Sequence, residues 1–169
     1  MNFIARYKTP DGFDDLWLTS DGECLTEIRF HDGTQVLANW KEARELSVFH
    51  ETLRWLDRYF EGSDPGFLPK YRIAGGLTDF RREVVELLLE IPFGMTTTYG
   101  ALATKIARRH GMVKMSAQAV GGAVGWNPLC ILIPCHRVIG ADGKMTGYGG
   151  GLPNKVALLR HEASFGSVD

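Results

Sequence analysis

The sequence predicts a protein with both helices and strands, α/β in the broad sense and α+β in its arrangement. A small antiparallel sheet subdomain precedes a mostly helical subdomain. Three observations carry this prediction. Residues 3–30 consist of short runs of alternating polarity separated by turn signals such as "PDG", which is typical of antiparallel strands. From Leu77 onward, apolar residues recur at helical spacing. The 169 residues are 44% hydrophobic, which is enough for a packed core in one domain or in two small ones.

The first half of the chain contains three strand candidates and one helix candidate. The strands are "FIARYKT", "LWLTS" and "CLTEIRF", at residues 3–9, 16–20 and 24–30. One face of a helix within residues 45–62 carries Val48, Leu53, Leu56 and Tyr59/Phe60, and Gly62 stands beyond its end as a C-cap. Prolines and glycines then mark a linker across residues 63–76.

The second half begins with three helix candidates. Residues 77–94 start at a plausible N-cap, Thr78, and leave the helical pattern before Pro92. A second helix lies within residues 97–111, and a short third one, rich in Ala and Gly, lies within residues 116–127 with Ser116 as its N-cap. Two short helices joined by the tight connection "HGMVKM" are either a plain packing unit or a helix-turn-helix.

The rest of the chain contains one apolar run, one loop and one helix. The run "CILIP" at residues 130–134 has the pattern of a buried strand. Glycines dominate the turn-rich stretch at residues 140–154. Residues 155–166 are expected to form the last helix.

Charge and composition restrict the class of protein. A formal net charge of −1 does not predict nucleic-acid binding, although a local basic patch remains compatible with it. No apolar stretch reaches the roughly 20 residues of a membrane span. The first residues lack a signal-peptide pattern, so we expect a cytoplasmic protein whose three cysteines are thiols. Neither a C-x-x-C pair nor a histidine cluster is present, so we expect no metal site and no cofactor.

The function of the protein depends mainly on the role of Cys135, within "IPCHR". It could be an inert buried thiol, a metal ligand, half of a disulfide or a nucleophile. Only a thiolate is a good nucleophile, so activation needs a base such as His136, reached through a water or a bend after Pro134. His136 would in turn need a carboxylate, for which Asp142 and Glu162 are the candidates; Glu162 is favoured because a helix holds it. The alternative is a buried cysteine and a surface histidine that never meet.

Asn127 is the other polar side chain close to this run. An Asn-Pro step favours a turn, and an asparagine side chain can hydrogen-bond to its own backbone. The residue is therefore either a simple helix stop or the corner that orients the cysteine segment.

The segment "NPLCILIPCHRVIGADGKMTGYGGGLPNKVALLRHE" resembles the O6-alkylguanine-DNA alkyltransferase family, the methylated-DNA–protein-cysteine S-methyltransferases. The hallmark of that family is a PCHR[VI] box after an asparagine hinge, followed by a Y-x-G-G loop and an LL-x-HE helix. "FRREVVELLLEIPFGMTTTYGALA" is similar to the preceding family stretch. The resemblance implies a ribonuclease-H-like subdomain and linker at residues 1–75, and a DNA-binding, alkyl-accepting domain with a winged helix-turn-helix at residues 76–169.

The resemblance also implies a role for each matching residue. Cys135 would accept the alkyl group from O6 of guanine, His136 would be its base through a water, and Glu162 would orient His136. Asn127 would hold the active-site turn, and Tyr99 would crowd the target phosphate and donate a proton to N3 of the leaving guanine. The residues expected to contact DNA or the flipped base are Gln118, Tyr148, Gly149, Ala119 and Ser116.

The family implies direct-reversal DNA repair by a monomer that acts on double-stranded DNA containing O6-alkylguanine, without an obligate protein partner or a membrane. The target base must be flipped out of the stack, and the thioether product leaves the protein consumed after a single turnover. Lys105, Arg108, Arg109 and Lys114 are either phosphate contacts or an ordinary solvated face.

Three positions depart from the family pattern. Gln118 stands where the family commonly has the arginine that takes the place of the flipped base. Gly149 and Ala141 stand where many or some relatives carry larger or hydroxylated residues, so we expect a roomier pocket that also accepts O4-alkylthymine. Cys24 lacks the partners of the zinc site found in some relatives.

The Gln118 change leaves other functions open. Alkyltransferase-like proteins bind alkylated DNA without repairing it, but they commonly lack the cysteine that this chain has. A helix-turn-helix regulator that senses alkylation would need a further domain, and a cysteine hydrolase would need an oxyanion loop.

Overall fold

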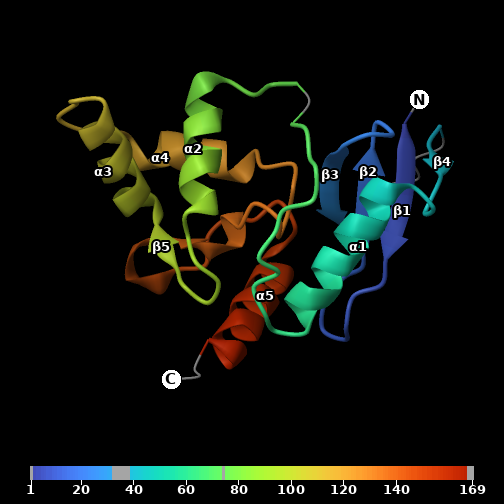
Figure 1. The fold of residues 1–169 in the computed structure, drawn as a ribbon. Coiled ribbons are helices and arrows are strands. Elements are labelled where there is room, and N and C mark those ends of the chain that lie inside the picture. Colours follow the sequence, from blue (N-terminus) through green and yellow to red (C-terminus); the bar gives the residue numbers. More distant parts are fainter. Residues whose placement is uncertain (1, 32–38, 74, 167–169) are drawn as a thin grey trace.

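The computed structural model describes residues 2–31, 39–73 and 75–166. Figure 1 shows a strand-rich half that carries the N-terminus and a helical half that contains α2, α3 and α4, with the last helix, α5, next to α1. The predicted α+β architecture is therefore confirmed: a small sheet precedes a run of helices.

The N-terminal sheet has four strands in the order β3-β2-β1-β4. The strands β1 (Phe3–Tyr7), β2 (Leu16–Ser20) and β3 (Leu25–Phe30) are antiparallel neighbours, as their alternating sequences predict. The fourth strand, β4 (Lys41–Glu42), pairs parallel with β1 and was not predicted, since two residues carry no periodic signal.

The first helix, α1 (Ser47–Phe60), lies against the sheet (Figure 1) and buries six residues: Val48, Phe49, Thr52, Trp55, Leu56 and Tyr59. Gly62 follows its end with φ = +91°, a conformation that favours glycine. The predicted helix and its glycine terminator are confirmed.

The outer edge of β3 joins the two halves of the chain. Leu25 forms an isolated parallel bridge with Tyr71 of the linker, and Ile28 forms one with Leu129. The Ile28 N–H donates to the Pro128 carbonyl at 2.9 Å, and the Cys130 N–H donates to the Ile28 carbonyl at 3.1 Å. The segment that leads to Cys135 is thus fixed to the sheet by backbone hydrogen bonds.

Three helices follow the linker, as expected. They are α2 (Asp79–Leu89), α3 (Tyr99–Arg109) and α4 (Ala117–Gly125). The hydroxyls of Thr78 and Ser116 accept the expected capping hydrogen bonds at the starts of α2 and α4. The pair α3 and α4 agrees with a helix-turn-helix, whereas the wing remains a prediction.

Thr97–Thr98, labelled β5, pairs parallel with β6, Val138–Ile139. This pairing connects the start of α3 to the segment just after Cys135. Two-residue strands far apart in the sequence could not be predicted from a local pattern.

The expected strand at residues 130–134 is wrong, because this run is a tight turn. Ile131 has φ = +68°, and the Ile133 N–H donates to the Leu129 carbonyl at 3.0 Å. The run is buried throughout, so an apolar sequence gives no periodicity to separate strand from turn. A short 3-10 turn, η1 (Cys135–Arg137), follows it.

The last helix begins earlier than expected. The structure places α5 at Leu152–Phe165, because Pro153 fits the first helical turn, where its missing N–H is not needed. The turn-rich stretch before it contains a second 3-10 turn, η2 (Ala141–Gly143). Within the described residues, no helix has the length and apolar character needed to cross a membrane.

Candidate active site

Cys135 lies at the start of η1, immediately after the buried turn. The residue is 6% exposed, and its N–H donates to the Ile133 carbonyl at 2.7 Å. The Asn127 Nδ2 atom donates to the Cys135 Sγ at 3.1 Å. All three cysteines of the chain are free thiols, so Cys135 is not part of a disulfide.

Asn127 organises the whole turn around that thiol. Its Nδ2 also donates to the Ile133 carbonyl at 2.8 Å, and its Oδ1 accepts from the Leu129 N–H at 2.9 Å. The side chain therefore does more than end α4: it bridges both ends of the turn and contacts the sulfur.

His136 and Glu162 meet in the interior. The His136 Nε2 and the Glu162 Oε1 are 2.6 Å apart, and both side chains are buried. Asp142, the other carboxylate considered, is exposed in η2. His136 is therefore not a surface residue, and its Nδ1 is buried without a hydrogen-bond partner among the described residues.

Glu162 accepts hydrogen bonds on both oxygens. The Arg137 Nε donates to Oε2 at 2.9 Å, and its Nη2 donates to Oε1 at 3.0 Å. The Gly94 N–H adds a bond to Oε2 at 3.0 Å, and the Tyr59 hydroxyl donates to Oε1 at 2.7 Å. Arg137 is held in turn by the Ile91 carbonyl at 2.6 Å. This set fixes the carboxylate that orients His136.

Burial and these donors act in opposite directions on the pKa of Glu162. Burial raises it, but the hydrogen bonds and charges of His136 and Arg137 outweigh burial and lower it to about 2. Burial lowers the pKa of His136, against the opposing effect of Glu162. At neutral pH the pair is therefore an anionic carboxylate and a neutral imidazole.

The pKa of the Cys135 thiol is raised, chiefly by burial, although the Asn127 hydrogen bond and the Lys155 charge oppose the rise. The sulfur is therefore a thiol at neutral pH and needs a base. Lys155 is itself buried, and its Nζ donates to the carbonyls of Val138 at 2.7 Å and Thr146 at 3.0 Å.

A mostly apolar groove of about 730 Å³ opens beside this site between α3, α4 and the glycine-rich loop. Five of the residues named from the sequence line it: Tyr99, Gln118, Ala141, Tyr148 and Gly149. The Tyr99 hydroxyl donates to the Thr146 carbonyl at 3.5 Å. Ser116 and Ala119 do not line the groove; they lie exposed at the start of α4, where the Ser116 hydroxyl accepts from the Ala119 N–H.

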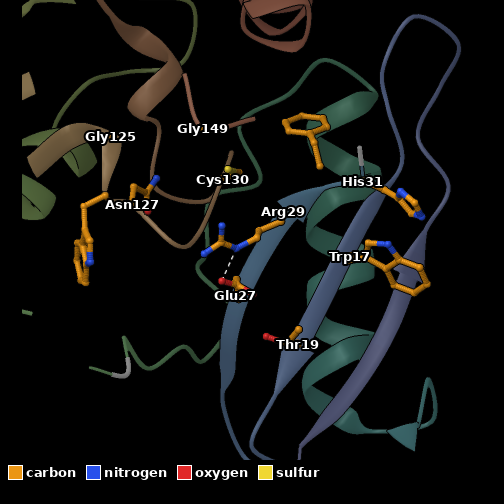
Figure 2. Close-up of a pocket in the computed structure, with 11 residues that line it drawn as sticks. Trp17, Thr19, Glu27, Arg29, His31, Gly125, Asn127, Cys130 and Gly149 are labelled. Atoms are coloured by element: carbon orange, nitrogen blue, oxygen red, sulfur yellow. Dashed lines mark hydrogen bonds and ion pairs between the residues drawn. The ribbon is translucent and has the colours of Figure 1, made fainter. Parts of the chain in front are cut away.

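A second, smaller cavity of about 190 Å³ lies on the other side of Gly125 and Gly149, which line both cavities. Figure 2 shows Asn127, Cys130 and Gly149 on one side of this cavity and Trp17, Thr19, Glu27 and Arg29 on the strands opposite. The thiol that lines it belongs to Cys130, whose pKa burial raises to about 12. Cys130 is therefore an unreactive thiol.

The four basic residues named from the sequence differ in their surroundings. Lys105 and Arg109 both form ion pairs with Glu90, and Arg109 also contacts Glu83. Within residues 2–31, 39–73 and 75–166, Arg108 and Lys114 form no ion pair; both line a hollow between α3 and α4. No cluster of three or more potential metal ligands occurs in those ranges.

Sequence reasoning missed Tyr59, Gly94 and Lys155 as parts of the site. Tyr59 lies on the apolar face of α1, where its pattern indicates only core packing. Gly94 contributes a backbone N–H, which no sequence pattern reveals. Lys155 is the first residue of the expected last helix, where a lysine is predicted to be a surface residue.

The fold and the site together bring the buried Cys135 thiol and the His136–Glu162 pair next to an open groove beside two short helices. Comparison with known families agrees. The family model described as "6-O-methylguanine DNA methyltransferase, DNA binding domain" matches residues 79–164, and that described as its "ribonuclease-like domain" matches residues 3–67.

Curated relatives match along nearly the whole chain. The methylated-DNA–protein-cysteine methyltransferase of Mycobacterium tuberculosis is 38% identical over 98% of this chain and 97% of its own length. That of Methanosarcina acetivorans is 39% identical over 96% and 99%. The crystal structure of the M. tuberculosis O6-methylguanine methyltransferase has a TM-score of 0.82 at 37% identity, covering 100% of this chain and 97% of that one. The chain belongs to the 6-O-methylguanine DNA methyltransferase family.

Proposed function

We propose that this protein repairs DNA by moving the alkyl group of O6-alkylguanine irreversibly to its own Cys135, and that each molecule reacts once. The observation that carries the proposal is the arrangement around the sulfur: Asn127 contacts Sγ at 3.1 Å, and Glu162 holds the adjacent His136, whose Nδ1 has no hydrogen-bond partner within the described part of the chain. A related M. tuberculosis protein, 37% identical with a TM-score of 0.77 over 96% of this chain and 92% of that one, has been crystallised in complex with DNA.

The chemistry balances with these residues, Tyr99 and water. The Cys135 thiol gives its proton to Nδ1 of His136 through one water molecule, and the thiolate attacks the carbon bound to O6. A carbon–sulfur bond forms as the carbon–O6 bond breaks, so the electron pair of that bond passes to guanine. Tyr99 donates a proton to N3 of guanine as it leaves, which improves the leaving group, and the proton taken up by His136 then passes through water to the tyrosinate, so that both side chains end neutral. The product is a thioether, and neither the site nor the reaction offers a step that breaks it.

The groove between α3, α4 and the glycine-rich loop takes the flipped nucleotide. Tyr148 and Gly149 line the pocket for the base, and Tyr99 faces the neighbouring phosphate. Gln118, Ala119 and Ser116 on α4 lie along the DNA, and Gln118 takes the place of the flipped base. Because position 149 carries no side chain, the pocket also accepts O4-alkylthymine.

The remaining expectations belong to the same proposal. We expect the protein to act as a monomer on double-stranded DNA. The division into residues 1–75 and 76–169 and the cytoplasmic location also remain proposals.

The test is the intact mass of the protein after incubation with a duplex carrying O6-methylguanine. The wild type should gain one methylene unit per molecule, and the gain should stop at one. Cys135→Ala should gain nothing, whereas Cys24→Ala and Cys130→Ala, which remove the other buried thiols, should keep the full gain.

A protein that binds the lesion selectively without gaining mass would contradict the proposal and would instead fit a non-repairing alkyl-DNA binder. A gain that persists in Cys135→Ala would assign the acceptor to another residue. A duplex with O4-methylthymine, run in parallel, tests the wider substrate range separately.

A further inference from the structure

The N-terminal half contributes one side chain to the active site. Tyr59 projects from α1, and its hydroxyl donates to Oε1 of Glu162 at 2.7 Å. The same oxygen accepts from His136, whose Nε2 lies 3.5 Å from the Tyr59 oxygen. A residue assigned to the core by sequence thus shares one acceptor atom with the histidine beside Cys135.

The tyrosine ring is held in place by both halves of the chain. It stacks on Trp55 with 5.7 Å between centroids and meets Phe93 edge-on at 5.7 Å. Its backbone carbonyl accepts from His161 of α5 at 2.9 Å. The side chain is buried, so water does not compete for the hydrogen bond of its hydroxyl. The donor is therefore preorganised toward Glu162.

We propose that Tyr59 is a positioning residue for alkyl transfer: its hydroxyl orients the Glu162 carboxylate and limits how strongly that carboxylate attracts the His136 proton. The inference rests on the proposed function, in which His136 must be neutral to act as a base. By sharing Oε1, the tyrosine weakens the Glu162–His136 attraction and keeps Nδ1 available.

Every charged group around the pair bears on this proposal. His136 faces Glu162 and Lys155 from α5, Arg137 from η1 and Tyr59 from α1. Lys155 and Arg137 both lower the pKa of His136, whereas Glu162 raises it. Burial, and then Glu162, raise the pKa of Tyr59 well above its usual value, so the tyrosine stays a neutral donor across the working pH range.

The direction of the effect follows from these charges. Without the Tyr59 hydroxyl, Oε1 has one donor fewer and attracts the His136 proton more strongly, so the pKa of His136 rises. More of the histidine is then protonated at pH 6, where it cannot act as a base. The acid limb of the pH–rate profile should therefore move to higher pH.

The variant that tests the inference is Tyr59→Phe, measured by single-turnover methyl transfer with saturating DNA. We expect a rate about tenfold lower at pH 6, a smaller deficit at pH 8 and an unchanged Kd for DNA; this fold-change is the size expected for one hydrogen bond to a charged group.

The matched control is Tyr7→Phe. The Tyr7 hydroxyl also donates to a carboxylate, that of Asp57, at 2.9 Å, but it lies between the sheet and α1, away from Cys135. Both variants lose one tyrosine–carboxylate hydrogen bond in the same half of the chain. Tyr7→Phe should keep the rate and the pH profile.

A readout independent of transfer separates this inference from the proposed function. NMR titration of the His136 imidazole in the unreacted protein should show a neutral ring with the proton on Nε2 and a higher pKa in Tyr59→Phe than in the wild type. A wild type that gains no methyl group would contradict the proposed function. The titration would still show whether the Tyr59 hydroxyl affects the pKa of His136.

Two results would overturn the inference. One is a His136 pKa and a pH–rate profile that are the same in Tyr59→Phe and the wild type. The other is a rate loss that Tyr7→Phe reproduces, because the hydroxyl would then serve only the stability of the N-terminal half.

Discussion

Asn127 opposes the burial-raised pKa of the Cys135 thiol more strongly than the Lys155 charge does. Burial raises the pKa of the Cys135 thiol, and the first opposing effect is the hydrogen bond from the Asn127 amide. That amide is in turn locked by the Ile133 carbonyl and the Leu129 N–H. Reactivity and local structure thus depend on the same side chain.

Asn127→Ala should slow alkyl transfer by about tenfold or more, since a hydrogen bond to a charged group contributes about 1.5–3 kcal/mol. The pKa of the Cys135 thiol should rise further, so the rate should be lost most at neutral pH and partly return in alkali. Single-turnover rates across pH, with DNA binding measured in parallel, check this. An unchanged rate would mean that the 3.1 Å contact with Sγ has no effect on the thiol.

Gln118 offers a second test at the scale of one residue. It lies exposed near the start of α4 and lines the groove, but it is uncharged and shorter than the arginine common in the family. Gln118→Arg should tighten DNA binding and steepen its salt dependence by about one unit of slope, because a guanidinium adds one phosphate contact. Gln118→Ala serves as the control, because alanine has neither the charge nor the length of arginine. Equal salt slopes in all three proteins would show that position 118 does not reach the DNA.

Residue chemistry was predictable from the sequence only where a motif or a rigid element supplied the geometry. Glu162 was favoured over Asp142 because a helix would hold it, and the structure places it 2.6 Å from His136. A bend after Pro134 was one of the alternatives considered, whereas the tight turn before it and the Tyr59 contact were not predictable. Both depend on tertiary packing between segments that are far apart in the sequence.

At the scale of elements, α3 divides its basic residues between two tasks. Lys105 and Arg109 form ion pairs with Glu90, which follows α2, so they connect two helices. Arg108 is exposed and forms no ion pair within residues 2–31, 39–73 and 75–166, and it lines a hollow next to the start of α4. The sequence could not separate the two groups, because their difference depends on ion pairs with Glu90, which only tertiary packing brings next to α3.

Arg108→Gln should therefore weaken DNA binding and lower its salt slope by about one unit, whereas Arg109→Gln should leave both nearly unchanged. The two variants remove the same charge from adjacent positions, so net charge is controlled. Fluorescence anisotropy with an undamaged duplex at several salt concentrations provides the measurement. If both variants lose affinity equally, only the overall charge matters. The prediction that Arg108 contacts DNA while Arg109 connects two helices is then wrong.

The elements themselves were predictable where a periodic pattern covered enough residues. The helices α1 and α2 have long apolar faces and were expected, and Thr78 was identified as an N-cap. The run at residues 130–134 was mistaken for a strand because complete burial removes the alternation that identifies strands. The β5–β6 pair has no local signal and forms only because two distant segments meet.

At the scale of the whole molecule, Glu162 is the point where distant parts of the chain converge. It accepts from Tyr59 of α1, from Gly94 after α2 and from Arg137 of η1. The sequence predicts two subdomains, but it gives no sign that they share one buried carboxylate. The carboxylate that holds His136 therefore also connects distant parts of the fold.

Removing this charge should destabilise the protein as a whole. In Glu162→Gln the buried Arg137 loses its counter-charge, so the free energy of unfolding at pH 7 should fall by about 3 kcal/mol. Glu90→Gln is the control, because Glu90 is an exposed carboxylate whose loss should change stability little. Urea denaturation of the unreacted proteins measures both.

The same variant predicts how stability depends on acid. The pKa of Glu162 is about 2 in the folded protein, below its ordinary value of 4.5, so its contribution is complete above pH 4.5 and is lost as the pH falls toward 2. The wild type should therefore lose more stability over that interval than Glu162→Gln, and the two unfolding curves should converge in acid. Curves that stay parallel from pH 7 to pH 2 would show that Glu162 is not the carboxylate that joins the two halves.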